Sequence, residues 1–211
     1  MNIPSFIFIS AASAFIPVIA GLFCARFTPR DLKIFLLYLA INCLSNIVSI
    51  GLAMMKLNNL WLLHVFTPIQ FALFIWIFSQ WQKPPVKHFF LSAIPAFTLV
   101  WLLAMLFFEN ISRFNSLTRP LEALVLIGVS GFTLYQLQQE SIGILFRKPS
   151  FWIASGTLIY FSGMIILYTL SNSLLEVSIE TLRTVWLTIQ PTVNISANLL
   201  FAAGFLCLRP R

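Results

Sequence analysis

The chain has 211 residues, of which 59% are hydrophobic and only 9% are charged, and its formal net charge is +7. Soluble domains contain about 25% charged residues, so this composition excludes an ordinary soluble protein and indicates a membrane protein. The positive charge does not indicate a nucleic-acid-binding protein, because the basic residues lie in short connections and form no basic cluster elsewhere.

Seven apolar segments follow one another along the chain, and each is long enough to cross a bilayer, which takes about 20 residues of helix. The predicted spans are Ile3–Ala25, Ile34–Met55, Trp61–Gln80, Phe89–Phe108, Leu117–Leu137, Phe151–Ser171 and Thr184–Leu208. Only short connections separate them, so we predict one all-α domain over residues 1–211, a polytopic membrane protein with seven transmembrane helices. The first span is expected to be retained, because Met1–Ser5 lacks the positive charge of a signal peptide.

The basic residues divide unequally between the two ends of the predicted helices. Nine lie in the first, third and fifth connections and in the C-terminal tail: Arg26, Arg30, Lys33, Lys83, Lys87, Arg147, Lys148, Arg209 and Arg211. Four lie on the opposite side: Lys56, Arg113, Arg119 and Arg183. Short loops rich in Lys and Arg stay in the cytoplasm. We therefore predict an outside N-terminus, a cytoplasmic C-terminus and insertion in a bacterial inner membrane.

The last outer connection, Asn172–Arg183, is expected to form a short helix on the membrane surface. Ser173 and Glu176 have the spacing of a capping box, in which each side chain bonds the backbone N–H of the other residue. Apolar and polar residues are mixed along the segment, as in helices that lie at a membrane interface. We therefore predict a short helix that lies on the outer surface.

Polar side chains inside the spans are the candidate functional residues, because polar groups are costly in lipid. Two spans carry them as stripes on one helix face: Asn42, Ser45, Asn46 and Ser49 in the second span, and Gln190, Asn194 and Asn198 in the seventh. Further polar residues lie in the third, fifth and sixth spans: His64, Thr67 and Gln70, then Arg119 and Glu122, then Tyr160, Ser162 and Tyr168. The predicted ligand-binding residues are His64, Gln70, Glu122, Asn46, Gln190, Asn194 and Tyr168.

Two interpretations of these polar residues remain open. If the stripes face one another, they line a polar pocket that opens to the outside, with His64 and Glu122 at its mouth and the amides below. Alternatively, the stripes only join helices through hydrogen bonds. Arg119, one turn before Glu122, and His64 are both candidate partners of the carboxylate. A coupled pair of His64 and Glu122 would make function depend on external pH between about 5 and 8.

Several chemistries are excluded by missing residues. The last span has no lysine for a retinal Schiff base, and two histidines, His64 and His88, are too few for a zinc hydrolase. The sequence contains no GxSxG, HExxH or glycine-rich phosphate-binding motif. We therefore predict no catalytic residue, no metal site and no cofactor, and an enzyme is not the expected function. The three cysteines lie in or beside spans and suggest no disulfide framework.

The stretches Trp61-Leu-Leu-His64 through Gln70-Phe71 and Asn194 through Asn198-Leu-Leu-Phe201 resemble small uncharacterised bacterial seven-helix membrane proteins. This resemblance implies the fold and topology and assigns no activity. The layout of the spans is also similar to SWEET-type sugar transporters, in which a linker helix joins two three-helix repeats. Pro68 and Gln70 of the third span recur in reverse order as Gln190 and Pro191 of the seventh.

The predicted pocket and the absence of a cytoplasmic domain together favour a membrane-embedded module that senses or binds a small ligand. Such a module needs a membrane or cytoplasmic partner protein to pass on a signal, and no nucleic acid is expected as a partner. A small solute transporter or permease is the first alternative. The second alternative is a non-catalytic assembly subunit, in which the polar stripes only join helices.

Overall fold

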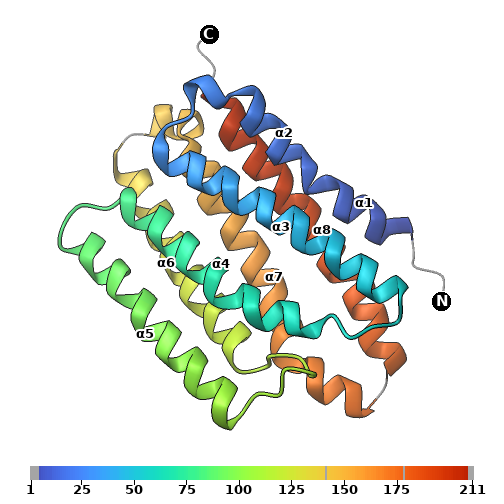
Figure 1. The fold of residues 1–211 in the computed structure, drawn as a ribbon. Helices are drawn as coiled ribbons and strands as arrows, with labels where there is room; N and C mark the ends of the chain where they lie inside the picture. Colours follow the sequence, from blue (N-terminus) through green and yellow to red (C-terminus); the bar gives the residue numbers. More distant parts are fainter. Residues whose placement is uncertain (1–4, 141, 178, 209–211) are drawn as a thin grey trace.

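The computed structural model describes residues 5–140, 142–177 and 179–208, and every secondary-structure element in these ranges is helical (Figure 1). The α-helices are α1 (Ser5–Ser13), α2 (Phe15–Phe23), α3 (Arg30–Met54), α4 (Leu60–Gln80), α5 (Val86–Phe107), α6 (Thr118–Glu140), α7 (Pro149–Val177) and α8 (Ile179–Leu206). Two short 3-10 helices, η1 (Ala25–Phe27) and η2 (Ile142–Arg147), lie in connections.

Seven segments of the described chain are long and apolar enough to cross a membrane. They are Ser5–Phe23, Arg30–Met54, Leu60–Gln80, Val86–Phe107, Thr118–Gln139, Pro149–Ser171 and Arg183–Leu206. The prediction of an all-α protein with seven such helices is confirmed. The first segment consists of α1 and α2, which are separated at Ala14.

The expected surface helix over 172–183 does not form as a separate element. Instead, α7 continues to Val177, and α8 begins at Ile179. The sequence between Gly163 and Pro191 contains no glycine or proline, so no residue there opposes helix continuation. The capping-box side chains of Ser173 and Glu176 lie outside the described side chains.

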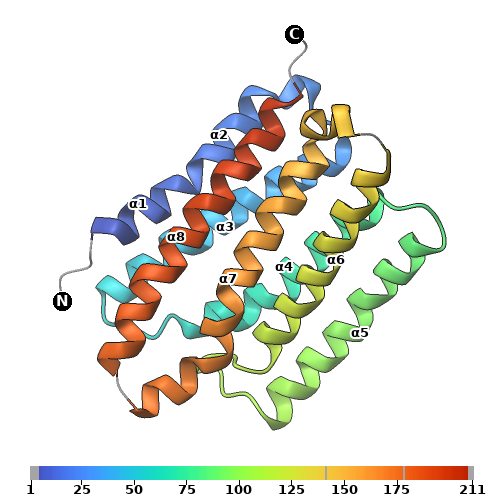
Figure 2. The same ribbon diagram turned by 180° about the vertical axis from the view of Figure 1, so that it is seen from behind.

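The helices form a bundle in which two sets lie one behind the other. In Figure 1, α3, α4 and α5 lie in front of α8, α7 and α6, and Figure 2 shows the second set from behind. Helices α1 and α2 pack along α8 at one edge of the bundle, and α5 stands at the opposite edge against α4. Helix α7 lies between α6 and α8 and packs on both.

Aromatic side chains fill the space between the two sets of helices. The ring centroid of Phe35 on α3 lies 5.9 Å from that of Phe74 on α4 and 5.1 Å from that of Phe201 on α8. Phe74 also meets Phe161 of α7, with centroids 5.8 Å apart. All three pairs are edge-to-face, the geometry that aromatic quadrupoles favour. This core joins α3, α4, α7 and α8, and two of its rings, Phe74 and Phe201, also line the polar cavity described below.

Small residues bring α7 and α8 into close contact. A Cβ atom added to Gly163 would lie 2.6 Å from Cγ1 of Val193, and one added to Gly156 would lie 2.6 Å from the Phe201 ring. Membrane helices commonly approach through such residues, because association in lipid depends on close packing. The approach sets the position of α8 and therefore of its polar stripe.

Candidate functional site

A buried charged cluster forms where α6 begins. Arg119 and Glu122 are one turn apart, and their side chains are 5% and 0% exposed. Arg119 donates from Nη1 to Glu122 Oε2 at 3.2 Å and to Gln70 Oε1 of α4 at 2.9 Å. A charge within a membrane span requires a partner, and the guanidinium and the carboxylate supply one to each other. Arg119 is therefore the partner of Glu122, as one of the two predicted alternatives had it.

Two tyrosines extend this cluster toward the middle of the bundle. The Arg119 guanidinium carbon lies 5.2 Å from the ring centroid of Tyr168 on α7, a cation–π contact. The hydroxyl oxygen of Tyr168 lies 3.4 Å from that of Tyr160, two turns earlier on the same helix. Arg119 Nε and Glu122 Oε1 are buried without a hydrogen-bond partner in the described chain. Buried polar atoms without a partner are costly, so the cluster is not fully compensated by its own hydrogen bonds.

Among the described residues, the side chain of His64 has its partners in the connection between α5 and α6, not in Arg119 or Glu122. Its Nε2 lies 2.9 Å from the carbonyl oxygen of Arg113, and its Nδ1 lies 3.7 Å from Glu109 Oε2. Because a carbonyl accepts, Nε2 carries the hydrogen in this arrangement. No hydrogen bond or ion pair joins His64 to Glu122 in the described residues, so the contact on which a coupled titrating pair would depend is not observed.

Glu109 lies in the connection between α5 and α6 and binds the first residue of α6. Its Oε1 accepts from the backbone N–H groups of Leu117 and Thr118 at 2.9 Å each, and its Oε2 accepts from Thr118 Oγ1 at 2.8 Å. The carboxylate therefore caps the first turn of α6, whose N–H groups have no partner within the helix. From the same connection, the buried Asn115 donates from Nδ2 to Thr67 Oγ1 of α4 at 2.9 Å.

A small cavity lies in the middle of the bundle, and we call it the amide chamber. Its volume is about 40 Å³, enough for about one to three water molecules. It is lined by Tyr38, Leu39, Asn42, Asn46, Phe74, Tyr160, Gln190, Asn194, Ala197 and Phe201, which come from α3, α4, α7 and α8. The amide stripes of α3 and α8 therefore meet across one cavity.

The amides of α8 and α3 have different surroundings. Asn194 donates from Nδ2 to the carbonyl oxygen and hydroxyl of Ser10 on α1, at 3.2 and 2.9 Å. Asn198 donates from Nδ2 to Ser13 Oγ at 2.9 Å. By contrast, the side chains of Asn42, Asn46 and Gln190 form no hydrogen bond with any described residue. Part of the α8 stripe thus joins helices, and the remaining amides are free to bind a solute.

The predicted site residues fall into three groups. Asn46, Gln190 and Asn194 line the amide chamber. Gln70, Glu122 and Tyr168 surround Arg119. His64 lies apart from both groups, beside Glu109. Tyr160 touches Tyr168 and also lines the chamber, so it connects the first two groups.

The prediction missed two tyrosines that line the chamber, together with Glu109. Tyr38 precedes Asn42 by four residues and Asn46 by eight, so the helical period that identified the α3 stripe also includes Tyr38. Tyr160 is a polar residue of the sixth span that the predicted site did not include. Glu109 gave no signal, because a carboxylate in a loop is ordinarily solvated. Within the described residues, no group of three His, Cys, Asp or Glu side chains is placed to hold a metal ion.

Comparison of the chain with protein-family models, with curated proteins and with solved structures gave no match.

Proposed function

We propose that this protein is a membrane-embedded binding module whose amide chamber takes a small, neutral, hydrogen-bonding solute. One observation carries the proposal: Asn42, Asn46 and Gln190 line a cavity inside the bundle and have no hydrogen-bond partner in the described chain. The three side chains are half-buried, and polar groups without a partner inside a membrane span are costly. A solute with hydroxyl or amide groups would satisfy them.

The lining residues also specify the kind of solute. They include no Asp, Glu, Lys, Arg or His, so a charged solute would find no counter-charge in the chamber. Amide and phenol groups both donate and accept hydrogen bonds, which suits a polyol, a urea or a small amide. The volume of about 40 Å³ limits the solute to a few non-hydrogen atoms unless α3 moves away from α8.

Binding is tested by following the melting temperature of the purified protein in detergent. Millimolar ethylene glycol, glycerol, acetamide and urea are the probes, because a ligand that binds only the folded state raises this temperature with the logarithm of its concentration once that exceeds the dissociation constant. We expect such a rise with at least one probe, and its loss in Asn46→Leu. Asn198→Ala is the matched control: its side chain bonds Ser13 and does not line the chamber, so it should melt earlier but keep the rise.

Two outcomes of that experiment would reject the binding module. The first is that none of the four probes raises the melting temperature. The second is a rise that Asn46→Leu leaves unchanged, because the solute would then bind elsewhere. In that case the assembly subunit becomes the better function, since the bonds of Asn194 and Asn198 to α1 are those of a structural helix junction.

Transport of the solute is a second candidate function, favoured by Pro191. This proline lies inside α8 directly after Gln190, at the chamber, and it interrupts the helical hydrogen bonds there. Interrupted helices at mid-membrane sites are a feature of transporters. Uptake of a bound probe into sealed proteoliposomes, abolished by Asn46→Leu, would assign transport. Binding without uptake would assign sensing, for which a partner protein is required.

The proposed orientation places the N-terminus outside and the C-terminus in the cytoplasm of a bacterial inner membrane. The unequal distribution of Lys and Arg supports it. In a variant whose three native cysteines are replaced by alanine, Glu180→Cys should react with a membrane-impermeant thiol reagent in intact cells. Lys83→Cys should react only after the cells are opened. Both positions are exposed, and the reverse pattern would invert the orientation.

A further inference from the structure

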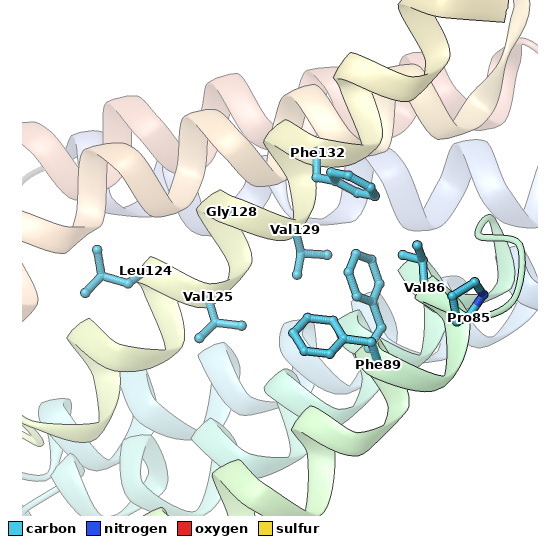
Figure 3. Close-up of a pocket in the computed structure, with 9 residues that line it drawn as sticks. Pro85, Val86, Phe89, Leu124, Val125, Gly128, Val129 and Phe132 are labelled. Atoms are coloured by element: carbon cyan, nitrogen blue, oxygen red, sulfur yellow. The ribbon is translucent and has the colours of Figure 1, made fainter.

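A groove on the outer surface of the bundle is unrelated to the amide chamber. It lies between α5 and α6, has a volume of about 510 Å³ and is lined by Pro85, Val86, Phe89, Phe90, Leu124, Val125, Gly128, Val129 and Phe132 (Figure 3). All nine residues are apolar. The volume falls in the range of about 300–1,000 Å³ that is usual for small-molecule sites.

The shape of the groove comes from a glycine and from two aromatic residues. A Cβ atom added to Gly128 would meet no other atom within 4 Å. Because glycine has no side chain, α6 leaves open space in the groove at this position. Phe89 is 74% exposed and rises from the α5 wall toward the gap. Phe90 and Phe132 meet edge-to-face, with centroids 6.0 Å apart, and join the two helices near Pro85.

The end of the groove near Pro85 is basic. Lys83 is exposed, and its side chain forms no hydrogen bond or ion pair with a described residue. Lys87 is half-buried and donates from Nζ to Gln80 Oε1 at 3.3 Å. His88, one residue further along α5, is exposed. Lys83 and Lys87 flank the lining residues Pro85 and Val86 in the chain. An apolar groove with two lysines in this position is complementary to a molecule with an apolar tail and an anionic head.

We propose that this groove is a binding site for an anionic phospholipid, with one acyl chain between α5 and α6 and the phosphate at Lys83 and Lys87. In the orientation proposed above, these lysines lie at the cytoplasmic leaflet, where anionic lipids are enriched and where basic sites between helices bind their head groups. The acyl chain fills a groove that no described side chain fills.

A second copy of the chain fits this groove less well. Copies in one membrane share one orientation, so a symmetric dimer through this face would place the two basic ends side by side. Lys83 and Lys87 of both copies would then repel one another at the same depth. A phospholipid brings the opposite charge to the same place.

The test is a lipid titration of the purified full-length protein, followed by native mass spectrometry. Phosphatidylglycerol and phosphatidylcholine with identical acyl chains are compared, so that only the head-group charge differs. We expect tighter binding of phosphatidylglycerol. In Lys83→Gln/Lys87→Gln this binding should weaken about thirtyfold, because each lysine near an anionic surface contributes roughly a factor of five. Binding of phosphatidylcholine should stay unchanged.

Two matched variants separate the groove from general surface effects. Arg26→Gln/Lys33→Gln removes the same charge from two exposed residues on the same side of the bundle and should keep the preference for phosphatidylglycerol. Gly128→Phe fills the groove and should weaken both lipids, whereas Gly51→Phe, also at a position with open space, should weaken neither. Phosphatidylglycerol with a photoreactive acyl chain should crosslink the unmodified protein within 85–90 and 124–132, a readout that needs no folded variant.

Three results would overturn the proposal. One is equal binding of the two lipids by the unmodified protein. Another is an equal loss of preference in the Arg26→Gln/Lys33→Gln control. The third is a dimer of the unmodified protein that Gly128→Phe converts to a monomer, because the groove would then be an interface between copies of the chain.

Discussion

Helices α3 and α8 carry the same residue type at the same spacing, yet their asparagines have different surroundings. Asn194 and Asn198 of α8 are bonded to Ser10 and Ser13 of α1. Asn42 and Asn46 of α3 line the amide chamber, and their side chains form no hydrogen bond with a described residue. The spacing determines which face of the helix is polar. The role of that face depends on which helix packs against it, and α1 packs on α8.

The strongest test of a paired polar group concerns the charged cluster. Glu122→Gln removes the carboxylate that compensates the buried Arg119. Removing one partner of a buried ion pair costs roughly 3–5 kcal/mol, so the free energy of unfolding in mixed detergent micelles should fall by about that amount. Arg119→Gln/Glu122→Gln should recover a large part of the loss. A double variant as unstable as the single one would show that the pair contributes little as a pair.

The position of the α8 stripe is tested at its contact with α7. Gly163→Ala places a methyl group 2.6 Å from Val193 Cγ1. Overpacking of this kind costs about 1–3 kcal/mol, and the shift of α8 should loosen its bonds to α1. Gly131→Ala is the control, because its Cβ would meet nothing within 4 Å. The control should be neutral or slightly stabilising, since alanine favours helix by up to about 1 kcal/mol over glycine.

The two stripes themselves are compared by removing one amide from each. Asn198→Ala should lower the free energy of unfolding by about 0.6–2 kcal/mol, the contribution of a hydrogen bond between membrane helices. Asn42→Ala should leave it nearly unchanged, because that side chain has no protein partner. Chemical unfolding of the two variants under identical conditions measures both. Equal losses would mean that both stripes join helices.

The seven spans were predictable because the thickness of the bilayer sets the length of each apolar segment. The helical period placed Gln190 and Asn194 on one face of α8 and Asn46 in the stripe of α3. That the two faces meet across one cavity was left open by the sequence and is seen only in the structure. The partners of these residues were not predictable. Ser10 lies 184 residues before Asn194, and no local pattern specifies where α1 crosses α8.

Of the contacts in the charged cluster, only the ion pair of Arg119 with Glu122 could be predicted from the sequence. Glu122 and Arg119 are one helical turn apart, so their pairing follows from the sequence. The capping of α6 by Glu109 depends on how the connection 108–117 folds back onto Thr118. His64 obtains its partner from the same connection. The pairing of His64 with Glu122 was therefore a reasonable alternative on the sequence that the path of this loop excludes.

The smallest expected change in stability comes from the hydrogen bond that Trp101 of α5 donates to the backbone carbonyl of His64 on α4. Pro68 has no N–H to bond the carbonyl of His64, four residues earlier. The indole Nε1 of Trp101 on α5 donates to that oxygen at 3.0 Å instead. Trp101→Phe keeps an aromatic ring and removes this donor, so the free energy of unfolding should fall by about 0.5–1.5 kcal/mol.

Pro68→Ala supplies the missing N–H within α4, and this change makes the test specific. In the Pro68→Ala background the His64 carbonyl has a donor in its own helix, so Trp101→Phe should lose most of its effect. A double-mutant cycle over Pro68 and Trp101 measures this coupling. If Trp101→Phe costs the same in both backgrounds, the indole stabilises the protein through its apolar contacts. The hydrogen bond from α5 to the carbonyl of His64 would then contribute nothing to stability. Asn194 and Asn198 of α8 would differ in this respect, because their bonds to α1 are expected to contribute.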